Sequence, residues 1–308
     1  MATYYIGVDV GGTTIKMGIF SDTGELLEKW EIPTRLENHG ENILPDVVES
    51  MEQKRAERGG NIKGIGVGIP GPVTDDGVVL KCANLGWDVF SVKNTLASLT
   101  GVGNVKVGND ANIAALGEMW KGGGRGYDSI VMVTLGTGVG GGIIHKGKIL
   151  TGSRGAGGEI GHLKVELEET EVCGCGCRGC LEQYASATGV VRLAKKYMRE
   201  GSCLSDAKRI TAKMVFDGAK AGDDYCTEIV ERFGRYLGVA LSNVAHVADP
   251  EAFVIGGGVS KAGQIILDVV QKYYDENSMY ALKDKDFHLA ELGNDAGIYG
   301  AVRMVLFQ

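Results

Sequence analysis

The hydrophobic pattern of the N-terminal region predicts three strands in series, followed by a helix and a fourth strand. Residues 4–10 form a short apolar run, and residues 14–20 and 26–32 alternate apolar with other side chains, which is the period of a β-strand. Apolar side chains then recur at helical spacing within residues 42–58, and residues 63–69 return to a strand pattern. Because glycine-containing turns separate the first three strands, we expect them to form an antiparallel meander.

A second hairpin with the same turn chemistry follows in the middle of the chain. An apolar strand at residues 129–135, a Gly-Thr-Gly turn and a second strand at residues 139–145 echo the first hairpin. This echo predicts a duplicated α/β fold. We expect a smaller domain at residues 1–110, completed by a C-terminal helix at residues 297–308, and a larger domain at residues 111–296. Further helices are predicted at residues 111–120, 182–199, 211–219 and 224–247, and a further strand at residues 252–255.

The composition fits a folded protein with more than one domain. The chain has 308 residues, of which 44% are hydrophobic and 23% charged, the usual balance of globular proteins. Glycine is the exception, with 49 residues beside only 5 prolines and no Gly-X-Y repeat. The glycines gather in short clusters, where a backbone turns tightly or approaches a ligand closely.

Charge and hydropathy exclude two classes of partner. The net charge of −7 provides no basic field for nucleic acid. No uninterrupted apolar run is long enough to span a bilayer, and the chain enters its first strand without a basic and apolar leader. We therefore expect a cytoplasmic protein that binds neither nucleic acid nor membranes.

The turn from Asp9 to Lys16 is a candidate phosphate-binding loop. It has neither the P-loop pattern nor the Gly-x-Gly-x-x-Gly of a dinucleotide-binding helix. A strand follows it, so its glycines would let successive N–H groups converge on an anion within a hairpin. Asp9, at the end of a strand, could orient water or a magnesium ion. An ordinary glycine-rich hairpin is the alternative.

Two more glycine clusters support a nucleotide site. Residues 136–142 form a second Gly/Thr turn after an apolar strand, and residues 256–260 form a third glycine cluster between a strand and a helix. Three backbone-exposing loops after apolar strands are what a nucleotide cleft between two domains requires. The predicted ATP-phosphate contacts are Asp9, Gly11, Gly12, Thr13, Thr14, Lys16, Gly136, Thr137, Gly138, Gly256, Gly257 and Gly258.

An acidic residue at a strand-to-helix junction is the candidate general base. Asn109 and Asp110 follow an apolar run at residues 105–107 and precede a helical pattern. An Asn-Asp pair in this position is often only a helix cap. In the functional interpretation, Asp110 takes a proton from a sugar hydroxyl and Asn109 holds a neighbouring hydroxyl. Phosphoryl transfer requires little else besides positioning and charge neutralisation.

A dense cysteine cluster predicts a metal site. Four of the seven cysteines lie within residues 173–180, and thiolates this close together in a reducing compartment are best explained by tetrahedral zinc. His162, a short distance upstream, could complete a set with three cysteines, and a site of four cysteines is the alternative. Either set leaves no open position, so the zinc would be structural.

These motifs resemble those of the ROK family of bacterial sugar kinases and sugar-responsive repressors. The pattern Cys-x-Cys-Gly-x-x-Gly-Cys-x-Glu spans residues 173–182, and Glu-x-Gly-His spans residues 159–162. The resemblance covers essentially the whole chain and is closest to the glucokinase branch. It implies that zinc is held by His162, Cys173, Cys175 and Cys180, while Cys177 falls on a variable position.

The resemblance also implies a fold, a reaction and sugar ligands. The fold is the duplicated ribonuclease H-like fold of actin-like ATPases and sugar kinases, with two domains around a cleft. The reaction is the phosphorylation of D-glucose to glucose 6-phosphate by ATP with Mg²⁺, with Asp110 as catalytic base, in a homodimer or homotetramer. The implied sugar-binding residues are Asn84, Asn109, Asp110, Glu159, His162 and Glu182.

Other activities of the same family are the alternatives. An N-acetylmannosamine kinase or a fructokinase would share the same polar sugar contacts. A repressor of this family carries a helix-turn-helix before the kinase-like body, and Met1 lies only eight residues before Asp9. We therefore do not expect a repressor. A catalytically silent sugar sensor is disfavoured because Asp110 and both Gly/Thr turns are present.

Overall fold

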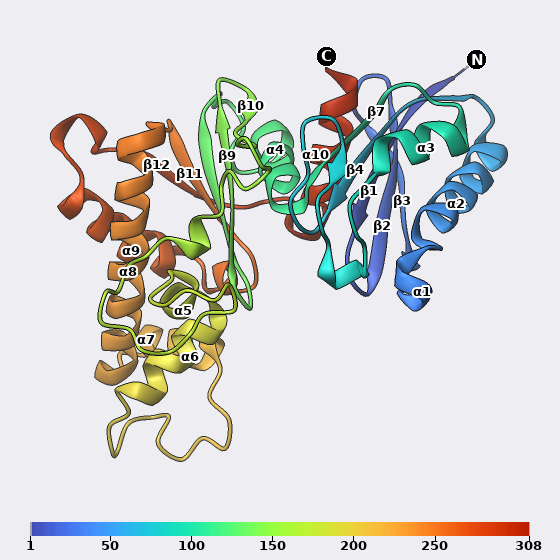
Figure 1. Ribbon diagram of the computed structural model, residues 1–308. Helices are drawn as coiled ribbons and strands as arrows, with labels where there is room; N and C mark the ends of the chain where they lie inside the picture. Colours follow the sequence, from blue (N-terminus) through green and yellow to red (C-terminus); the bar gives the residue numbers. More distant parts are fainter. Residues whose placement is uncertain (1, 308) are drawn as a thin grey trace. The chain divides into compact units, whose positions relative to one another are not determined.

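Two sheets with the same strand order organise the chain, which the computed structural model describes over residues 2–307 (Figure 1). The strands are β1 (Thr3–Val10), β2 (Thr14–Ser21), β3 (Leu26–Pro33), β4 (Asn61–Ile69), β7 (Val105–Asn109), β8 (Ile130–Leu135), β9 (Val139–His145), β11 (Ala252–Gly256) and β12 (Asp286–Leu289). The order β2-β1-β4-β7 in one sheet recurs as β9-β8-β11-β12 in the other. In both, the first two strands along the chain are antiparallel and the later strands are parallel. The predicted duplicated α/β fold is confirmed.

The chain divides into two compact units. Unit 1 comprises the chain up to Gly126, Lys148–Gly157 and the chain from Leu292 onwards; unit 2 comprises Tyr127–Gly147 and Gly158–Glu291. The helices of unit 1 are α1 (Glu37–Gly40), α2 (Ile43–Arg58), α3 (Val92–Thr100), α4 (Asp110–Lys121) and α10 (Ala296–Leu306), and its shorter elements are β5 (Val78–Val79), η1 (Ala83–Leu85), β6 (Phe90–Ser91), β10 (Lys148–Ile149) and η5 (Gly293–Asp295). Those of unit 2 are η2 (Ile160–His162), α5 (Glu182–Ala185), α6 (Ala187–Lys196), α7 (Ala212–Lys220), α8 (Asp224–Ala248), η3 (Val259–Ala262), α9 (Gln264–Asn277) and η4 (Tyr280–Leu282).

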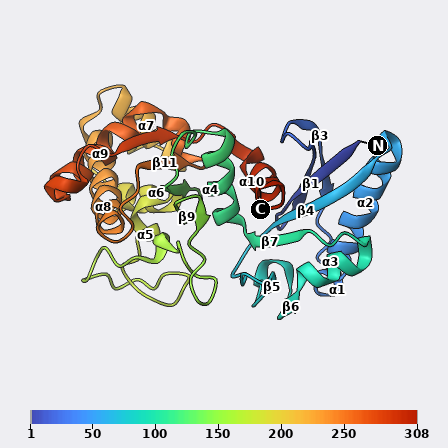
Figure 2. The same cartoon turned by 90° about the horizontal axis from the view of Figure 1, so that it is seen from above.

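The unit 1 sheet is covered on both faces, with α2 on one side and α10 on the other (Figure 2). In β4, large apolar residues alternate with glycines, and alternate residues of a strand face opposite sides. Ile65 and Val67 are fully buried in the core that also includes residues of α2. Glycines occupy the face towards α10, where a Cβ on Gly66 would lie 1.8 Å from the carbonyl oxygen of Ala301. The glycines of β4 therefore let a helix backbone rest directly on the sheet.

Helices α4 and α10 cross at equally close range. A Cβ on Gly300 would lie 1.8 Å from the carbonyl oxygen of Ile113, and one on Gly117 would lie 2.2 Å from that of Ala296. This contact groups α4 with unit 1, so unit 1 continues past residue 110 to Gly126. The predicted domain division placed this helix in the larger domain, and that division stays a prediction.

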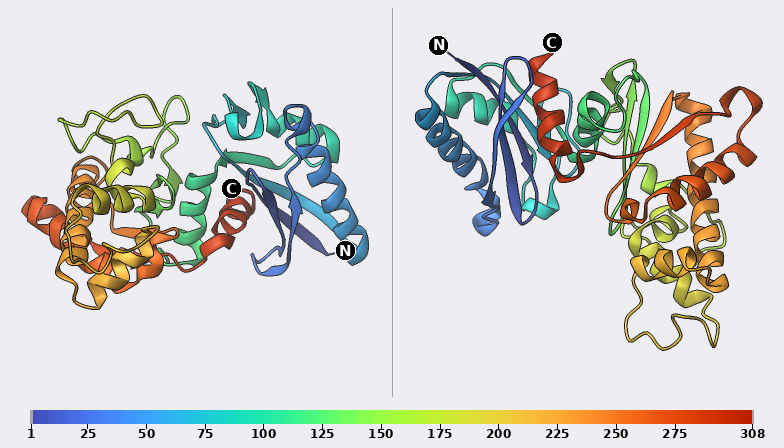
Figure 3. Two further views of the ribbon diagram at one scale, coloured as in Figure 1. Left: turned by 90° about the horizontal axis from the view of Figure 1, so that it is seen from below. Right: turned by 180° about the vertical axis from the view of Figure 1, so that it is seen from behind.

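Unit 2 packs its helices against its own sheet. In Figure 3, the long helices α8 and α9, drawn in orange, run side by side, and a Cβ on Gly234 of α8 would lie 2.3 Å from a side-chain atom of Val269 in α9. The central strands β8 and β11 contribute fully buried residues such as Val133 and Phe253 to the same core. Over the described residues, no helix combines the length and apolar character that crossing a membrane requires.

Most predicted elements occur at nearly the same residues, but the single helix predicted over residues 182–199 is wrong. The helix is interrupted at Ser186, whose backbone is extended, with φ −88° and ψ 173°. The Ser186 hydroxyl accepts the backbone N–H of Gly189 at 2.9 Å and so caps α6. Serine favours this capping geometry over the interior of a helix.

We predict that Gly300→Ala strongly destabilises unit 1. The new methyl group would overlap the Ile113 carbonyl, which belongs to a helix backbone that cannot move aside cheaply. We expect the free energy of unfolding to fall by about 2–3 kcal/mol, measured by urea denaturation. The matched control is Gly103→Ala, where a Cβ meets no atom within 4 Å. Equal stability of the two variants would contradict the close crossing of α4 and α10.

Candidate active site

The first Gly/Thr turn joins β1 to β2 in unit 1 and exposes its backbone. The Gly11 N–H donates to the Thr14 carbonyl at 3.0 Å, which closes the turn. Gly12 and Thr13 at its tip are exposed, and a Cβ on Gly12 would meet nothing within 4 Å. Protein packing therefore does not require glycine at position 12. The Lys16 ammonium, beyond the turn, donates to the Asn294 carbonyl at 3.3 Å.

Asp9 lies at the end of β1, against the first turn of α10. A Cβ on Gly297 would lie 2.5 Å from the Asp9 carboxyl carbon, so the helix must have glycine there to accommodate the side chain. Burial raises the pKa of Asp9 to about 6, with Lys16 opposing the shift and Asp110 adding to it. A carboxylate whose charge is disfavoured in this way gains most from a nearby cation.

Asn109 and Asp110 stand where β7 ends and α4 begins. The Asn109 side chain accepts the Asn112 N–H at 3.1 Å, and its amide donates to the Gly71 carbonyl at 3.1 Å. Asn109 is therefore the N-cap of α4, as the capping interpretation predicts. Asp110 is the first residue of α4, and its carboxylate accepts the Ala111 N–H at 2.8 Å. The negative charge of Asp110 helps to raise the pKa of Asp9, so the carboxylates of these two residues interact electrostatically.

The second and third glycine clusters lie in unit 2. In the β8–β9 turn the Gly136 N–H donates to the Gly138 carbonyl at 3.0 Å, and a Cβ on Gly136 would meet nothing within 4 Å. In the third cluster, Gly257 has φ +85° and a Cβ there would lie 2.6 Å from the backbone of Leu135. The fold therefore requires glycine at 257. Gly258 resembles Gly136, because a Cβ there also meets no atom within 4 Å.

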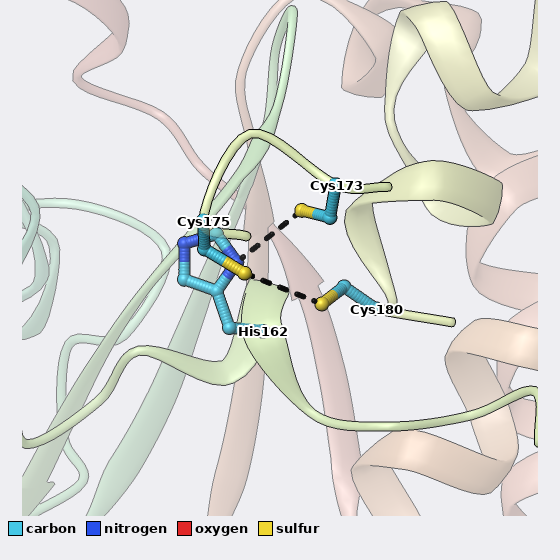
Figure 4. Close-up of side chains that lie close together, drawn as sticks. All are labelled: His162, Cys173, Cys175 and Cys180. Carbon is cyan, nitrogen blue, oxygen red and sulfur yellow. Dashed lines mark hydrogen bonds between the residues drawn. The ribbon is translucent and has the colours of Figure 1, made fainter. Parts of the chain in front are cut away.

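The structure brings together the four predicted metal ligands in unit 2 (Figure 4). The ligand atoms of His162, Cys173, Cys175 and Cys180 all lie within 4.8 Å of one another. The sulfurs of Cys175 and Cys180 are 3.6 Å apart, and Cys173 Sγ lies 3.9 Å from His162 Nδ1. Sulfurs bound tetrahedrally to zinc at about 2.3 Å lie about 3.8 Å apart. The donor set and its spacing therefore fit zinc.

Cys177 lies outside this group. Its thiol is exposed and is not among the clustered ligand atoms. Its backbone carbonyl accepts the Cys173 N–H at 2.7 Å, so Cys177 helps to close the turn that carries the ligands. A site made of four cysteines, the alternative from sequence, is not the arrangement that the structure shows.

Paired backbone segments bring His162 close to the cysteines. The Val165 N–H donates to the Gly179 carbonyl and the Leu181 N–H to the Leu163 carbonyl, both at 2.8 Å. Gly179 makes this pairing possible, because its φ is +71° and a Cβ would lie 1.8 Å from the Glu166 carbonyl oxygen. The segment after His162 and the segment around Cys180 thus run next to each other.

An ionic network that the sequence did not reveal supports the same loop. Arg192 of α6 forms ion pairs with Glu169 and with Glu171, and the Tyr184 hydroxyl donates to Glu169. Burial acts to raise the pKa of Glu169, but hydrogen bonds from Tyr184, from the Glu171 backbone and from Arg192 outweigh it and lower that pKa to about 2. The network keeps the loop before the cysteines attached to α6.

Glu182 approaches both the predicted metal ligands and the β8–β9 turn. One carboxylate oxygen accepts the Cys173 thiol at 2.9 Å and is 3.7 Å from His162 Nδ1. The other oxygen would lie 2.6 Å from a Cβ on Gly138, so glycine at that position allows the close approach. A single side chain therefore contacts the cysteine cluster and the second Gly/Thr turn.

The predicted sugar-binding residues fall on both units. Asn109 and Asp110 lie in unit 1, as does Asn84, which is exposed in η1. Unit 2 contributes Glu182, which is half-buried, together with Glu159 and His162, which are exposed at η2. Within each unit, the predicted residues occur at exposed turns or at the ends of elements.

Comparisons of sequence and of structure with known proteins find the same group of relatives. The model of the family described as the ROK family matches residues 5–307. A glucokinase from Halalkalibacterium halodurans is 42% identical over 96% of this chain and 93% of its own length. A ROK hexokinase structure from Thermus thermophilus has a TM-score of 0.82 and 32% identity, with 98% of this chain and 97% of that chain covered. A ROK family glucokinase structure from Streptomyces griseus, in complex with glucose and AMPPNP, has a TM-score of 0.74 and 32% identity, with 98% and 99% covered.

The shared fold is the one that the motifs implied. The repeated strand order and the solved relatives identify it as the duplicated ribonuclease H-like fold of actin-like ATPases and sugar kinases. The similarity extends over both units rather than over one of them. The chain therefore belongs to the ROK family.

Proposed function

We propose that this chain catalyses the ATP-dependent phosphorylation of D-glucose to glucose 6-phosphate. The observation that carries the proposal is its 42% identity, over nearly the full length of both chains, to a protein named as a glucokinase. A related structure that contains glucose and AMPPNP supports the same substrate pair. The chain also has an acid at the start of α4 and backbone-exposing turns in both units, which such a reaction requires.

Asp110 is the proposed general base. As the sugar 6-hydroxyl oxygen attacks the γ-phosphorus of ATP, the Asp110 carboxylate takes the hydroxyl proton, the bond to the bridging oxygen breaks, and ADP leaves. Its position at the N-terminal end of a buried helix fixes the carboxylate rather than leaving it on a mobile loop. The proposed sugar ligands are Asn84, Asn109, Asp110, Glu159, His162 and Glu182.

The glycine-rich turns are the proposed phosphate ligands. Their exposed backbone can donate N–H groups to phosphate oxygens, and Asp9 can hold water molecules of a Mg²⁺ ion that accompanies ATP. The raised pKa of Asp9, caused mainly by burial, supports this role because a cation would relieve the cost of its charge. The proposed set is Asp9, Gly11, Gly12, Thr13, Thr14, Lys16, Gly136, Thr137, Gly138, Gly256, Gly257 and Gly258.

A structural zinc ion is the proposed occupant of the cysteine cluster. His162, Cys173, Cys175 and Cys180 would hold it, and the ion would cross-link the loop that precedes α5. It would also fix the ring of His162 through Nδ1, so that the second ring nitrogen could bind a sugar hydroxyl. A homodimer or homotetramer in the cytoplasm stays a prediction.

A coupled assay of ADP release tests the reaction and the sugar. We expect turnover with glucose to exceed turnover with mannose, fructose and N-acetylmannosamine. Asp110→Asn should lower kcat by about 10²–10⁴-fold, because an amide cannot accept the proton, while glucose binding stays measurable by calorimetry. The exposed Asp22→Asn serves as control. Absence of turnover with every hexose would refute the kinase, and preference for another sugar would reassign the substrate.

We expect Cys175→Ala to lose zinc and Cys177→Ala to retain it. Both thiols are exposed and only two residues apart, but only Cys175 belongs to the ligand cluster. Loss of one of four ligands weakens a structural zinc site strongly. Elemental analysis of the purified variants measures the metal content. Equal zinc in the two variants would contradict the ligand assignment.

The buried charge of Asp9 predicts a pH-dependent stability difference. The pKa of about 6 in the folded chain exceeds the unfolded value of 3.8, so the folded state binds more protons in this window and stability falls as the pH rises through it. Asp9→Asn removes this titration. We expect its Tm, without ligands, to exceed that of the wild type above about pH 6 and the difference to shrink towards about pH 4. A difference in Tm that is independent of pH would argue against the raised pKa.

A further inference from the structure

In unit 1, a single threonine holds two carbonyl groups of the β1–β2 turn. The Thr34 hydroxyl donates to the Gly11 carbonyl at 2.7 Å. The Thr34 backbone N–H donates to the Thr13 carbonyl at 2.9 Å. Thr34 follows the last residue of β3, so it approaches the turn from outside the hairpin that forms it. Thr34 lies in neither a glycine cluster nor a motif, so no local pattern in the sequence points to it.

The second turn, in unit 2, is held in the same manner by the start of α6. The Thr188 hydroxyl donates to the Thr137 carbonyl at 2.7 Å. The Ala187 N–H donates to the Gly136 carbonyl at 2.8 Å. In both units, therefore, a threonine hydroxyl and a backbone N–H from one short segment bind two carbonyls of the Gly/Thr turn. The two turns belong to separate sheets and are held by different residues. The same kind of contact therefore occurs twice, independently, in the chain.

A hydrogen bond that fixes a carbonyl group also fixes the direction of the N–H group in the same peptide. The described peptide bonds are all trans, and in a trans peptide the C=O and N–H groups point in opposite directions. Carbonyls held by Thr34 therefore direct the N–H groups of Gly12 and Thr14 away from it. Carbonyls held by the start of α6 likewise direct the N–H groups of Thr137 and Gly138 away from that helix. We call each of these contacts a clamp: Thr34 on the β1–β2 turn, and Ala187 with Thr188 on the β8–β9 turn. Each clamp orients two backbone N–H donors of its turn.

The open glycines show that space is kept beside these donors. A Cβ on Gly12 or on Gly136 would meet no atom within 4 Å, and neither residue has a positive φ. The fold itself would therefore accept a side chain at either position. A side chain there would cover part of the turn and limit the approach of a ligand to its backbone.

We propose that Thr34 and Thr188 are positioning residues that hold the two turns in the conformation that binds the phosphate groups of a nucleoside triphosphate. The proposal rests on the proposed kinase function, because it concerns the turns assigned there to ATP. Neither threonine side chain touches the nucleotide; each acts through the carbonyl it binds. Loss of the hydroxyl lets the peptide rotate and adds an ordering cost to phosphate binding.

Steady-state kinetics and nucleotide titration test the two clamps separately. Thr34→Val and Thr188→Val remove each hydroxyl at nearly constant volume, whereas Thr34→Ser and Thr188→Ser retain it. We expect the valine variants to raise the KM for ATP and the Kd for AMPPNP by about 5- to 10-fold, the size of effect expected for one lost hydrogen bond. The KM for glucose should stay within about twofold, and the serine variants should restore nucleotide binding.

A matched control separates positioning from general stability. The Thr211 hydroxyl caps α7, an element that belongs to neither turn, by accepting the Met214 N–H at 3.2 Å. Thr211→Val should lower Tm but leave nucleotide binding unchanged. The proposal is overturned if the valine variants bind AMPPNP like the wild type. It is equally overturned if they lose affinity for ATP and glucose together.

Failure of this proposal and failure of the proposed kinase function give different results. A wild-type chain that forms no ADP with any hexose refutes the kinase, but titration with AMPPNP still measures whether the valine variants weaken nucleotide binding. If one valine variant fails to fold, the other still tests the proposal, because each threonine contacts its own turn.

Discussion

The close approach of α10 to the unit 1 sheet is the constraint on which much of that unit depends. A helix normally packs on a sheet through side chains, but here glycines in β1 and β4 let the helix backbone itself come into contact. A Cβ on Gly7 would lie 2.3 Å from the carbonyl oxygen of Ile298, in the first turn of α10. The same approach brings the start of α10 against Asp9 and requires glycine at 297. The burial that raises the pKa of Asp9 is thus a direct result of how the helix and the sheet are packed.

In unit 2, different elements contact the turn that joins the first two strands of the sheet. Residues of the segment from Cys173 to Thr188 contact this β8–β9 turn. Glu182 reaches Gly138 from the cysteine cluster, and Thr188 reaches Thr137 from α6. The duplicated sheets therefore retain the same strand order while the surroundings of their turns differ. In unit 2, Glu182 and the start of α6 contact the β8–β9 turn, whereas in unit 1 the first turn of α10 packs against Asp9 at the end of β1.

Local patterns in the sequence were sufficient for what depends on neighbouring residues. Strand alternation and glycine clusters identified both hairpins, because each of these signals lies within a short stretch. The cysteine spacing left two ligand sets open, and the family resemblance selected the four residues whose side chains the structure clusters. The break at Ser186 leaves no gap in the apolar spacing, and it is visible only in the extended backbone of Ser186 and in its capping bond to Gly189. Contacts between distant segments, such as Gly300 on Ile113 or Thr34 on Gly11, leave no local signal at all.

The grouping of the first and last parts of the chain into unit 1 also affects the order in which the protein can fold. Strands β1 and β4 leave the ribosome well before α10, the helix that covers one face of their sheet. Unit 2 is formed by chain that lies between the first and last parts of unit 1 in the sequence. It can therefore bury its core while the face of the unit 1 sheet that α10 covers is still open. During synthesis, an incomplete apolar surface therefore persists until α10 appears, and such surfaces are where chaperones bind and aggregation begins. A chain that lacks α10 would retain that vulnerability permanently.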